Sequence, residues 1–305
     1  MNHEKDIPRI IALTKTTQDL VNAGGSTSSI SRQTQQKQLH RLRHGVYMDA
    51  ATWKTLNPTQ KYVASTVAVL KTSTAPVLSH QTAALWYGAP LLSPPTSIHL
   101  AVAQNRIGKR RGVTAHCNKA EVIEDSCLLH GFAVSSALHT VVDCAGVLPL
   151  NSALCIADYF AHHGLVSIPE LQEALKQKTG RGAAVSRTVA ARVSPCSESP
   201  AESIARNLMH QWKIPLPEEQ SVIYTRSGGV YRPDFLWREH GVILEVDGEV
   251  KYSGIYGDAE VVIRREHRRQ RELEAEGWKI IRARWNELLN HPHTLRRRLA
   301  AAGIR

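Results

Sequence analysis

Two short apolar runs on either side of a tight turn at residues 238–241 constrain the fold of this 305-residue chain more than any other feature. They predict two strands joined as a hairpin, with Asp234 on the first strand and Glu245 and Asp247 on the second. Glu245 and Asp247 are two residues apart, so they share one face of a strand. Burying unpaired carboxylates among Val, Ile and Leu is costly, and a bound cation would remove that cost.

Three carboxylates from adjacent strands suit a hard cation such as Mg²⁺ or Mn²⁺, because these ions prefer oxygen ligands. A metal-bound water can become a nucleophile, and Lys251 would offset the charge that builds up on a phosphate. The pattern therefore predicts phosphodiester hydrolysis, with Asp234, Glu245 and Asp247 as catalytic residues and metal ligands. The alternative is an edge strand whose acidic side chains face solvent.

These residues resemble the core of the PD-(D/E)xK nucleases. Pro233-Asp234 and Glu245-Val-Asp247-Gly248 are closest to the DUF559 branch, which is related to very short patch repair endonucleases. The standard core has Lys two residues after the Glu, whereas this chain has Asp247 there. The DUF559 branch also carries Asp at this place, and Lys251 could supply the cation from a displaced position.

Two flanking motifs extend the resemblance to about residues 194–290. Upstream, residues 199–206 match the opening helix, and the resemblance directs Glu202 into the site, where it would position the metal or its water. The alternative for Glu202 is a helix-surface ion pair with Arg206, four residues later. Downstream, residues 266–278 match the following helix and strand, and the resemblance directs Glu266 and Arg269 towards the active site as supporting residues.

The net charge favours a polyanionic partner. The chain carries a formal charge of +11 and has a pI near 9.6, which points most simply to nucleic acid. Residues 264–305 hold twelve Lys and Arg against five Glu, so positive charge lies close in sequence to the proposed acidic site. This distribution suits a nuclease, in which basic side chains hold phosphates while carboxylates hold the metal. The alternative is a basic helix that is merely solvated. Residues 286–302 predict one basic helix that closes this region.

The first 48 residues predict three helices followed by a hairpin. The third helix, from residue 29 to about 38, has an almost wholly polar surface that could read base edges in the DNA major groove. The hairpin turns at Gly45 and would carry basic side chains towards phosphates. This pattern predicts a winged helix-turn-helix; the alternative is a small helical adaptor that binds protein. The candidate DNA-binding residues are Arg32, Gln33, Gln36, Lys37, Arg41 and Arg43.

The N-terminal and middle regions resemble the AbiEi-type antitoxins. The resemblance rests on the hairpin motif that ends in Gly45-Val-Tyr, on the segment from Ser79 to Leu85, and on the Val-x-Asp-Cys-Ala helix around Asp143. It implies a transcriptional autoregulator with a cognate toxin as partner. His80, His116, His139 and Asp143 are a conceivable catalytic set, but their spacing gives no support, and we interpret them as satisfied buried or surface groups.

Composition and hydropathy place the chain among soluble proteins. It has no run of 18 or more apolar residues and no apolar signal-peptide core near its start, so we expect a cytoplasmic protein without membrane contact. The five cysteines lack metal-ligand spacing, which favours free buried thiols over zinc ligands or disulfides.

The sequence thus predicts an α+β multidomain protein. Its parts are a winged helix-turn-helix (residues 1–55), an AbiEi-like α/β middle domain (56–193) and a PD-(D/E)xK restriction-endonuclease-like α/β domain (194–305). The preferred function is a metal-dependent DNA endonuclease acting in defence or repair. The rival is an AbiEi-type repressor that keeps an inactive nuclease fold as a scaffold. The oligomeric state stays open, although a palindromic operator or double-strand cutting would favour a homodimer.

Overall fold

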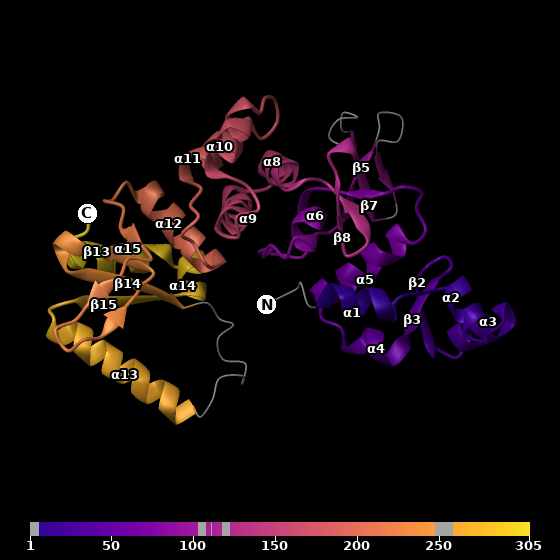
Figure 1. Ribbon diagram of the computed structural model, residues 1–305, viewed down its shortest axis with the longest axis horizontal. Coiled ribbons are helices and arrows are strands. Elements are labelled where there is room, and N and C mark those ends of the chain that lie inside the picture. The colour runs from indigo at the N-terminus through magenta and orange to yellow at the C-terminus, as the bar shows by residue number, and fades with distance from the viewer. Residues whose placement is uncertain (1–5, 103–107, 111, 118–122, 248–258) are drawn as a thin grey trace. The chain divides into compact units, whose positions relative to one another are not determined.

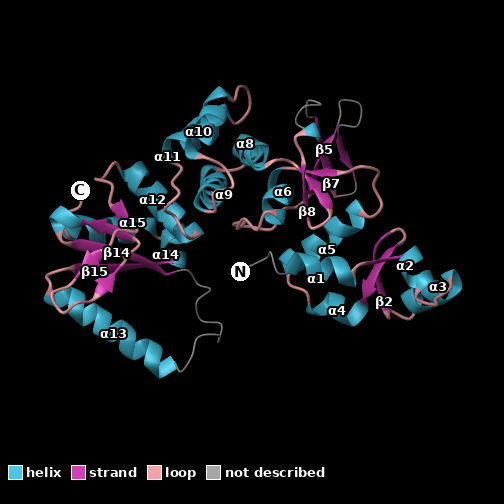
Figure 2. Ribbon diagram, in the orientation of Figure 1, coloured by secondary structure: helices cyan, strands magenta, loops and turns pink. Residues whose placement is uncertain are grey.

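The computed structural model describes residues 6–102, 108–110, 112–117, 123–247 and 259–305 (Figure 1). Side chains are described throughout these ranges except at 109, 110 and 259–266. The fold is mixed, with helices and several small sheets, as expected for an α+β chain (Figure 2). No helix in the described ranges has both the length and the apolar character needed to cross a membrane.

The chain divides into two compact units. The first comprises residues 1–148 with 178–182, and the second comprises residues 149–177 with 183–305. The expected domain boundaries at 55/56 and 193/194 lie within these units, so they stay predictions.

The first unit opens with three short helices and a three-stranded sheet of order β1-β3-β2. Capping boxes start the second and third helices, with Thr16 paired to Asp19 and Ser26 paired to Ser29. The third helix ends at Gln35, earlier than the sequence indicated, because Lys37 adopts a left-handed φ of +58° and turns the chain. The elements are α1 (Asp6–Leu13), β1 (Lys15–Thr16), α2 (Thr17–Asn22), α3 (Thr27–Gln35), β2 (Leu39–Arg43) and β3 (Val46–Asp49).

A six-stranded mixed sheet of order β6-β7-β5-β4-β9-β8 forms the rest of this unit. Ile7, Met48, Val67, Trp86 and Leu100 belong to one apolar core, so the N-terminal helices and the sheet pack together. The elements are α4 (Ala50–Thr55), α5 (Pro58–Leu70), β4 (Val77–Leu78), α6 (His80–Trp86), β5 (Ile98–Val102), β6 (Gly108–Arg110), β7 (Val113–Cys117), β8 (Cys127–Leu129), β9 (Phe132–Val134) and α8 (Ala137–Val147).

The second unit begins with four helices, and a buried polar network joins α9, α12 and β10 (Glu218–Glu219). Arg206 forms ion pairs with Asp158 and with Glu219, and the latter Nε–Oε2 distance is 3.3 Å. The surface ion pair between Glu202 and Arg206 was therefore the wrong alternative, because both side chains are buried and Arg206 has other carboxylate partners. The helices are α9 (Leu150–His162), α10 (Ile168–Gln177), α11 (Ala183–Arg192) and α12 (Pro200–Trp212).

A four-stranded sheet of order β10-β13-β14-β15 completes the second unit. The predicted hairpin is confirmed: β13 and β14 pair antiparallel, and Gly241 closes the turn with φ +61°. Strand β15 pairs parallel to β14, with α13 as the connection between them. Leu236, Ile243 and Leu273 pack together between the sheet and α13. The strands are β10 (Glu218–Glu219), β13 (Phe235–Trp237), β14 (Val242–Asp247) and β15 (Lys279–Arg284), with a small β11 (Ile223–Tyr224) and β12 (Val230–Tyr231) pair, and the helix is α13 (Ala259–Ala275).

Three sequence expectations need correction. Asp234 immediately precedes β13 instead of lying on it. The single basic helix expected over residues 286–302 is two helices, α14 (Trp285–Asn290) and α15 (Pro292–Ala301), because Pro292 has no backbone N–H and starts a new helix. The cysteines are free but not uniformly buried, since Cys117 and Cys196 are exposed.

Candidate functional site

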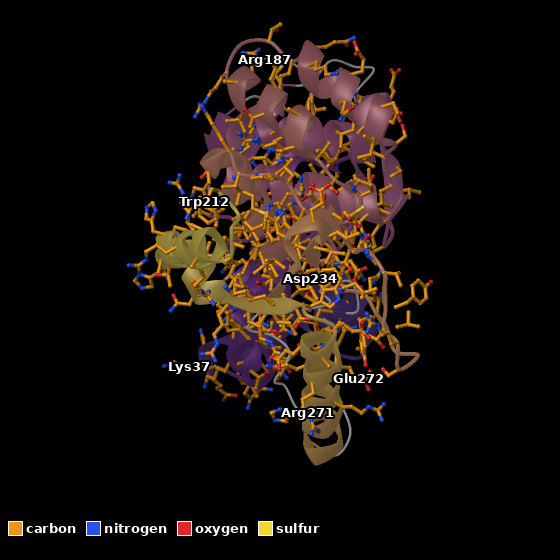
Figure 3. The ribbon with its side chains drawn as sticks, turned by 90° about the vertical axis from the view of Figure 1, so that its left-hand side faces the viewer. Lys37, Arg187, Trp212, Asp234, Arg271 and Glu272 are labelled. Atoms are coloured by element: carbon orange, nitrogen blue, oxygen red, sulfur yellow. The ribbon has the colours of Figure 1, made fainter. Side chains whose placement is uncertain are left out.

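Asp234, labelled in Figure 3, accepts one hydrogen bond from β14 and one from Gln220. Its Oδ2 accepts from the backbone N–H of Val246 at 2.8 Å, and its Oδ1 accepts from the Gln220 amide at 3.4 Å. Because Phe235 pairs with Leu244 in the antiparallel hairpin, the preceding Asp234 comes beside the stretch that carries Glu245. The fold therefore brings these two predicted site residues to the same part of the sheet.

Glu202 and Asp234 accept hydrogen bonds from the same donor, the side-chain amide of Gln220. The Gln220 amide that bonds to Asp234 also donates to Glu202 Oε2 at 3.1 Å. Glu202 is only 6% exposed, and it also accepts from Ser199 Oγ at 2.7 Å and from the Glu198 backbone N–H at 2.9 Å. Burial raises the pKa of Glu202, the hydrogen bond from Ser199 opposes this, and the charge of Asp234 raises the pKa further. Two carboxylates thus lie close enough to repel each other.

Glu245 lies on β14 and contacts two arginines. It forms an ion pair with Arg269 of α13, and its Oε2 lies 3.6 Å from Nε of Arg282 on β15. The Glu245 side chain is 12% exposed, so these pairs are partly shielded from water. The nuclease resemblance directs Arg269 towards the site, and in the structure Arg269 pairs with Glu245.

Three further residues were predicted for the acidic site: Asp247, Lys251 and Glu266. Asp247 is exposed at the end of β14. Lys251 lies outside the described residues. Glu266 belongs to α13, but its side chain also lies outside them.

The acidic residues do not form a compact metal-ligand group within the described part of the chain. There, the group of three or more His, Cys, Asp or Glu side chains with ligand atoms all within 4.8 Å of one another consists of His80, His99 and His116. Asp234 and Glu245 instead have hydrogen-bond and ion-pair partners from the protein. A cation at the acidic site would have to displace or join these partners.

Sequence reasoning missed the histidine group. His80 and His116 were considered with His139 and Asp143, whereas the structure brings His80 and His116 together with His99. His139 instead lies 3.2 Å from Oδ2 of Asp125. The available signal was two short apolar runs, residues 98–103 and 112–116, each of which carries one histidine.

The candidate DNA-binding residues lie on α3, on the turn after it and on β2. Five of them are exposed, and Arg43 is half-buried. Gln36 and Lys37 follow the end of α3 and so lie in the turn, not on the helix as expected. A surface pocket of about 310 Å³ beside this turn is lined by residues that include Lys37, Arg41 and Lys54. Three basic side chains around one hollow can accept an anionic group.

Comparison with known proteins does not assign a family. No family model matches the chain. It is 28% identical over 162 residues to two uncharacterized proteins of Mycobacterium tuberculosis, MT2308 of strain CDC 1551 / Oshkosh and Rv2248 of strain ATCC 25618 / H37Rv. The similarity covers 53% of this chain and 58% of each relative, so the chain spans less than two thirds of their length.

Among solved structures, the crystal structure of the Rv2827c protein from Mycobacterium tuberculosis matches 70% of this chain and 83% of that chain. The sequence identity is 13% and the TM-score is 0.37. A similarity of this size assigns neither fold nor activity.

Proposed function

We propose that this chain is a DNA-binding protein whose C-terminal region, residues 194–305, hydrolyses DNA phosphodiester bonds with Mg²⁺ or Mn²⁺. The observation that carries the proposal is the Gln220 amide, which bonds both Glu202 of α12 and Asp234 at the start of β13. It brings together carboxylates from two separate elements beside the strand that carries Glu245.

The order of elements supports this reading. The nuclease resemblance implies an opening helix, a strand hairpin that carries carboxylates, and then a helix and a strand. The second unit has α12, the β13–β14 hairpin, α13 and β15 in that order. The similar order of helices and strands supports only the proposed fold. The proposed activity rests on the carboxylates themselves.

Carboxylate oxygens such as those of Glu202, Asp234 and Glu245 are the ligands that a hard divalent cation prefers. Burial raises the pKa of Glu202, and the charge of the neighbouring Asp234 raises it further. A cation would relieve the repulsion between these two carboxylates. In the proposed mechanism Asp234 and Glu245 would hold Mg²⁺, and the bound ion would supply a water nucleophile and offset phosphate charge. Glu202 would position the metal or its water, and Asp247 would act as a ligand or water-orienting base. Lys251 stabilises the phosphate charge.

The N-terminal region would bring the nuclease to DNA as a winged helix-turn-helix. Its support is an exposed polar α3 that follows α2, together with a three-stranded sheet whose β2 carries Arg41 and Arg43. Gln33 would read base edges, while Lys37 and the two arginines of β2 would hold phosphates.

The test is cleavage of supercoiled and single-stranded DNA by the purified full chain with Mg²⁺ or Mn²⁺. Asp234→Ala and Glu245→Ala should abolish cleavage but leave DNA binding largely intact. Glu239→Ala, an exposed acidic residue in the hairpin turn, is the matched control and should cut normally. An active Asp234→Ala protein would overturn the assignment.

A second candidate is an AbiEi-type repressor with an inactive nuclease fold and a cognate toxin as partner. The observation that favours it is the pairing of Glu245 with Arg269 and Arg282, which satisfies this carboxylate without any metal. In the same assay, tight and salt-sensitive DNA binding without cleavage in either metal would select the repressor. Binding to a palindromic operator as a homodimer would strengthen that choice.

A further inference from the structure

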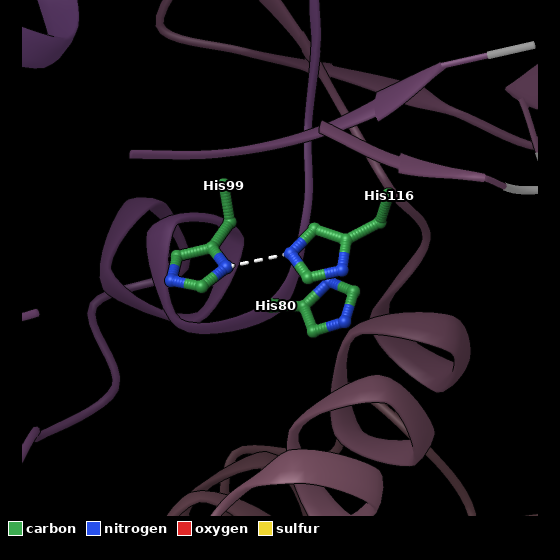
Figure 4. A group of neighbouring side chains, drawn as sticks. All are labelled: His80, His99 and His116. Atoms are coloured by element: carbon green, nitrogen blue, oxygen red, sulfur yellow. Dashed lines mark hydrogen bonds between the residues drawn. The ribbon is translucent and has the colours of Figure 1, made fainter. Parts of the chain in front are cut away.

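Three histidines meet in the first unit from three separate elements (Figure 4). His80 is the first residue of α6, His99 lies on β5, and His116 lies on the parallel neighbour β7. Nδ1 of His99 and Nε2 of His116 are 2.8 Å apart, and the ring of His80 stacks on His116 with a centroid distance of 3.7 Å. One nitrogen from each ring lies within 4.8 Å of the other two.

The backbone holds His80 in an uncommon conformation. Its φ is +51°, which a residue with a side chain rarely adopts, and the residue is only 5% exposed. Nonglycine residues in this region are often found where function requires a particular side-chain position. The backbone geometry at the start of α6 thus directs a buried imidazole towards the two strand histidines.

Polar groups next to His80 orient its ring. Its Nδ1 lies 3.1 Å from Ser79 Oγ and 3.6 Å from Oδ2 of Asp143 on α8. A carboxylate beside the second ring nitrogen is the usual partner of a metal-ligating histidine, because it sets the tautomer and the ring orientation. The positive charge of Lys178 also acts on the His80 ring and disfavours a positive charge there.

We propose that His80, His99 and His116 bind one Zn²⁺ ion, with Asp143 as the residue that positions His80 and a water in the fourth place. Three imidazoles are a common zinc ligand set, and the ion prefers Zn–N distances of about 2.0–2.1 Å in a tetrahedral arrangement. Such a geometry separates the ligand nitrogens by about 3.3 Å. The His99–His116 pair would therefore widen by roughly half an ångström, and His80 would turn away from its stacked position.

Zinc at this place would link α6 to the sheet. The ligands come from a helix start and two strands, so the ion would bind the folded chain but not the unfolded one and would stabilise it. The site is independent of the acidic residues in the second unit, because none of those residues belongs to the histidine group. Its test does not depend on nuclease activity.

The experiment is a Zn²⁺ titration of the full chain by calorimetry after dialysis against EDTA. We expect one Zn²⁺ at this site, with binding at least 100-fold weaker in His99→Gln and in His116→Gln, and ten- to 100-fold weaker in Asp143→Asn. His293→Gln, an exposed histidine elsewhere in the chain, should bind like the wild type.

Two outcomes would overturn the proposal. The first is the absence of saturable Zn²⁺ binding by the wild-type chain, which would mean that the three histidines only pack against one another. The second is equal binding by the wild type, His99→Gln and His116→Gln. Circular dichroism checks that each variant is folded. If a variant does not fold, Co²⁺ added to the wild type decides, because tetrahedral Co²⁺ with nitrogen ligands gives visible absorption bands far more intense than those of an octahedral surface-bound ion.

Discussion

Arg269 of α13 forms an ion pair with Glu245 of β14, the residue that the nuclease hypothesis assigns to the metal. The pair connects the helix to the sheet that it covers, and Arg282 approaches the same carboxylate from β15. A cation at Glu245 would therefore compete with a protein guanidinium, so under the nuclease hypothesis the strength of this pair would set the metal affinity of the site.

Replacing Arg269 with Gln should tighten metal binding. A hydrogen bond to a charged group contributes about 1.5–3 kcal/mol, and 1.4 kcal/mol corresponds to about a tenfold change in affinity. We expect about tenfold stronger Mn²⁺ binding by Arg269→Gln in calorimetry. Arg268→Gln is the control, because its exposed side chain contacts Glu272 and not Glu245. Unchanged Mn²⁺ affinity in Arg269→Gln would show that Glu245 is not a ligand.

Glu202 should make stability depend on pH. Its pKa is raised in the folded state, so the unfolded chain loses this proton first as pH rises above the ordinary value of 4.5. The contribution is fully present below that value and is lost as pH rises to the folded pKa. Glu202→Gln should remove this dependence, so its stability relative to the wild type should increase by on the order of 1 kcal/mol between pH 4 and pH 7.5. Urea unfolding at both pH values measures it, and a pH-independent difference would contradict it.

Removing Arg206 should destabilise the second unit strongly. Its guanidinium pairs with Asp158, which is 1% exposed, and burial raises the pKa of that carboxyl while Arg206 lowers it. Arg206→Ala leaves a buried carboxylate without its cation, and such losses cost about 3–5 kcal/mol. Denaturant unfolding measures the loss. Arg206→Met with Asp158→Leu should recover most of it, and a loss below about 1 kcal/mol in the single variant would contradict the role.

Lys37 should lower the stability of the fold and raise its affinity for DNA. It occupies the left-handed position after α3, where Gln38 N–H bonds to Gln33 O at 2.9 Å and closes the helix end. Lys37→Gly should raise the free energy of unfolding by about 1 kcal/mol, since glycine has no Cβ strain there. It should also weaken DNA binding through the lost charge. Lys37→Ala is the matched variant: it should weaken DNA binding equally without the gain in stability.

Arg41 should contribute to the salt dependence of DNA binding. It is exposed on β2, and each phosphate contact that is lost lowers the slope of log affinity against log salt by about 1. Fluorescence anisotropy of Arg41→Ala over a range of KCl concentrations measures this slope. Arg187→Ala on α11 removes the same charge at another exposed place and should leave the slope unchanged. An equal effect of both variants would indicate binding by net charge alone.

Local patterns predicted most elements of the fold. The apolar runs around residues 238–241 became β13 and β14, and the long charged segment before Gly277 became α13. These predictions work because alternation, capping and turn residues act over a few neighbouring positions. Pro292 is a local signal of the same kind, because a proline starts a new helix, and it divides the last basic segment into α14 and α15.

The pairing of side chains over long distances could not be predicted in the same way. Arg206 has a neighbouring Glu202 at helical spacing, yet it pairs with Asp158 and Glu219, which packing of α9, α12 and β10 brings to it. The partners of a buried charge depend on which helix faces pack together, and this packing cannot be predicted from a local sequence pattern.

The sequence by itself determined where the strands, turns and helices form and which carboxylates belong to one hairpin, because backbone propensities and hydrophobic alternation are local properties. Only the tertiary structure decided that Gln220 joins Glu202 to Asp234, that Glu245 meets Arg269, and that His80, His99 and His116 share one place. Each of these contacts depends on the packing of elements distant in the chain, and packing is set by the whole core at once.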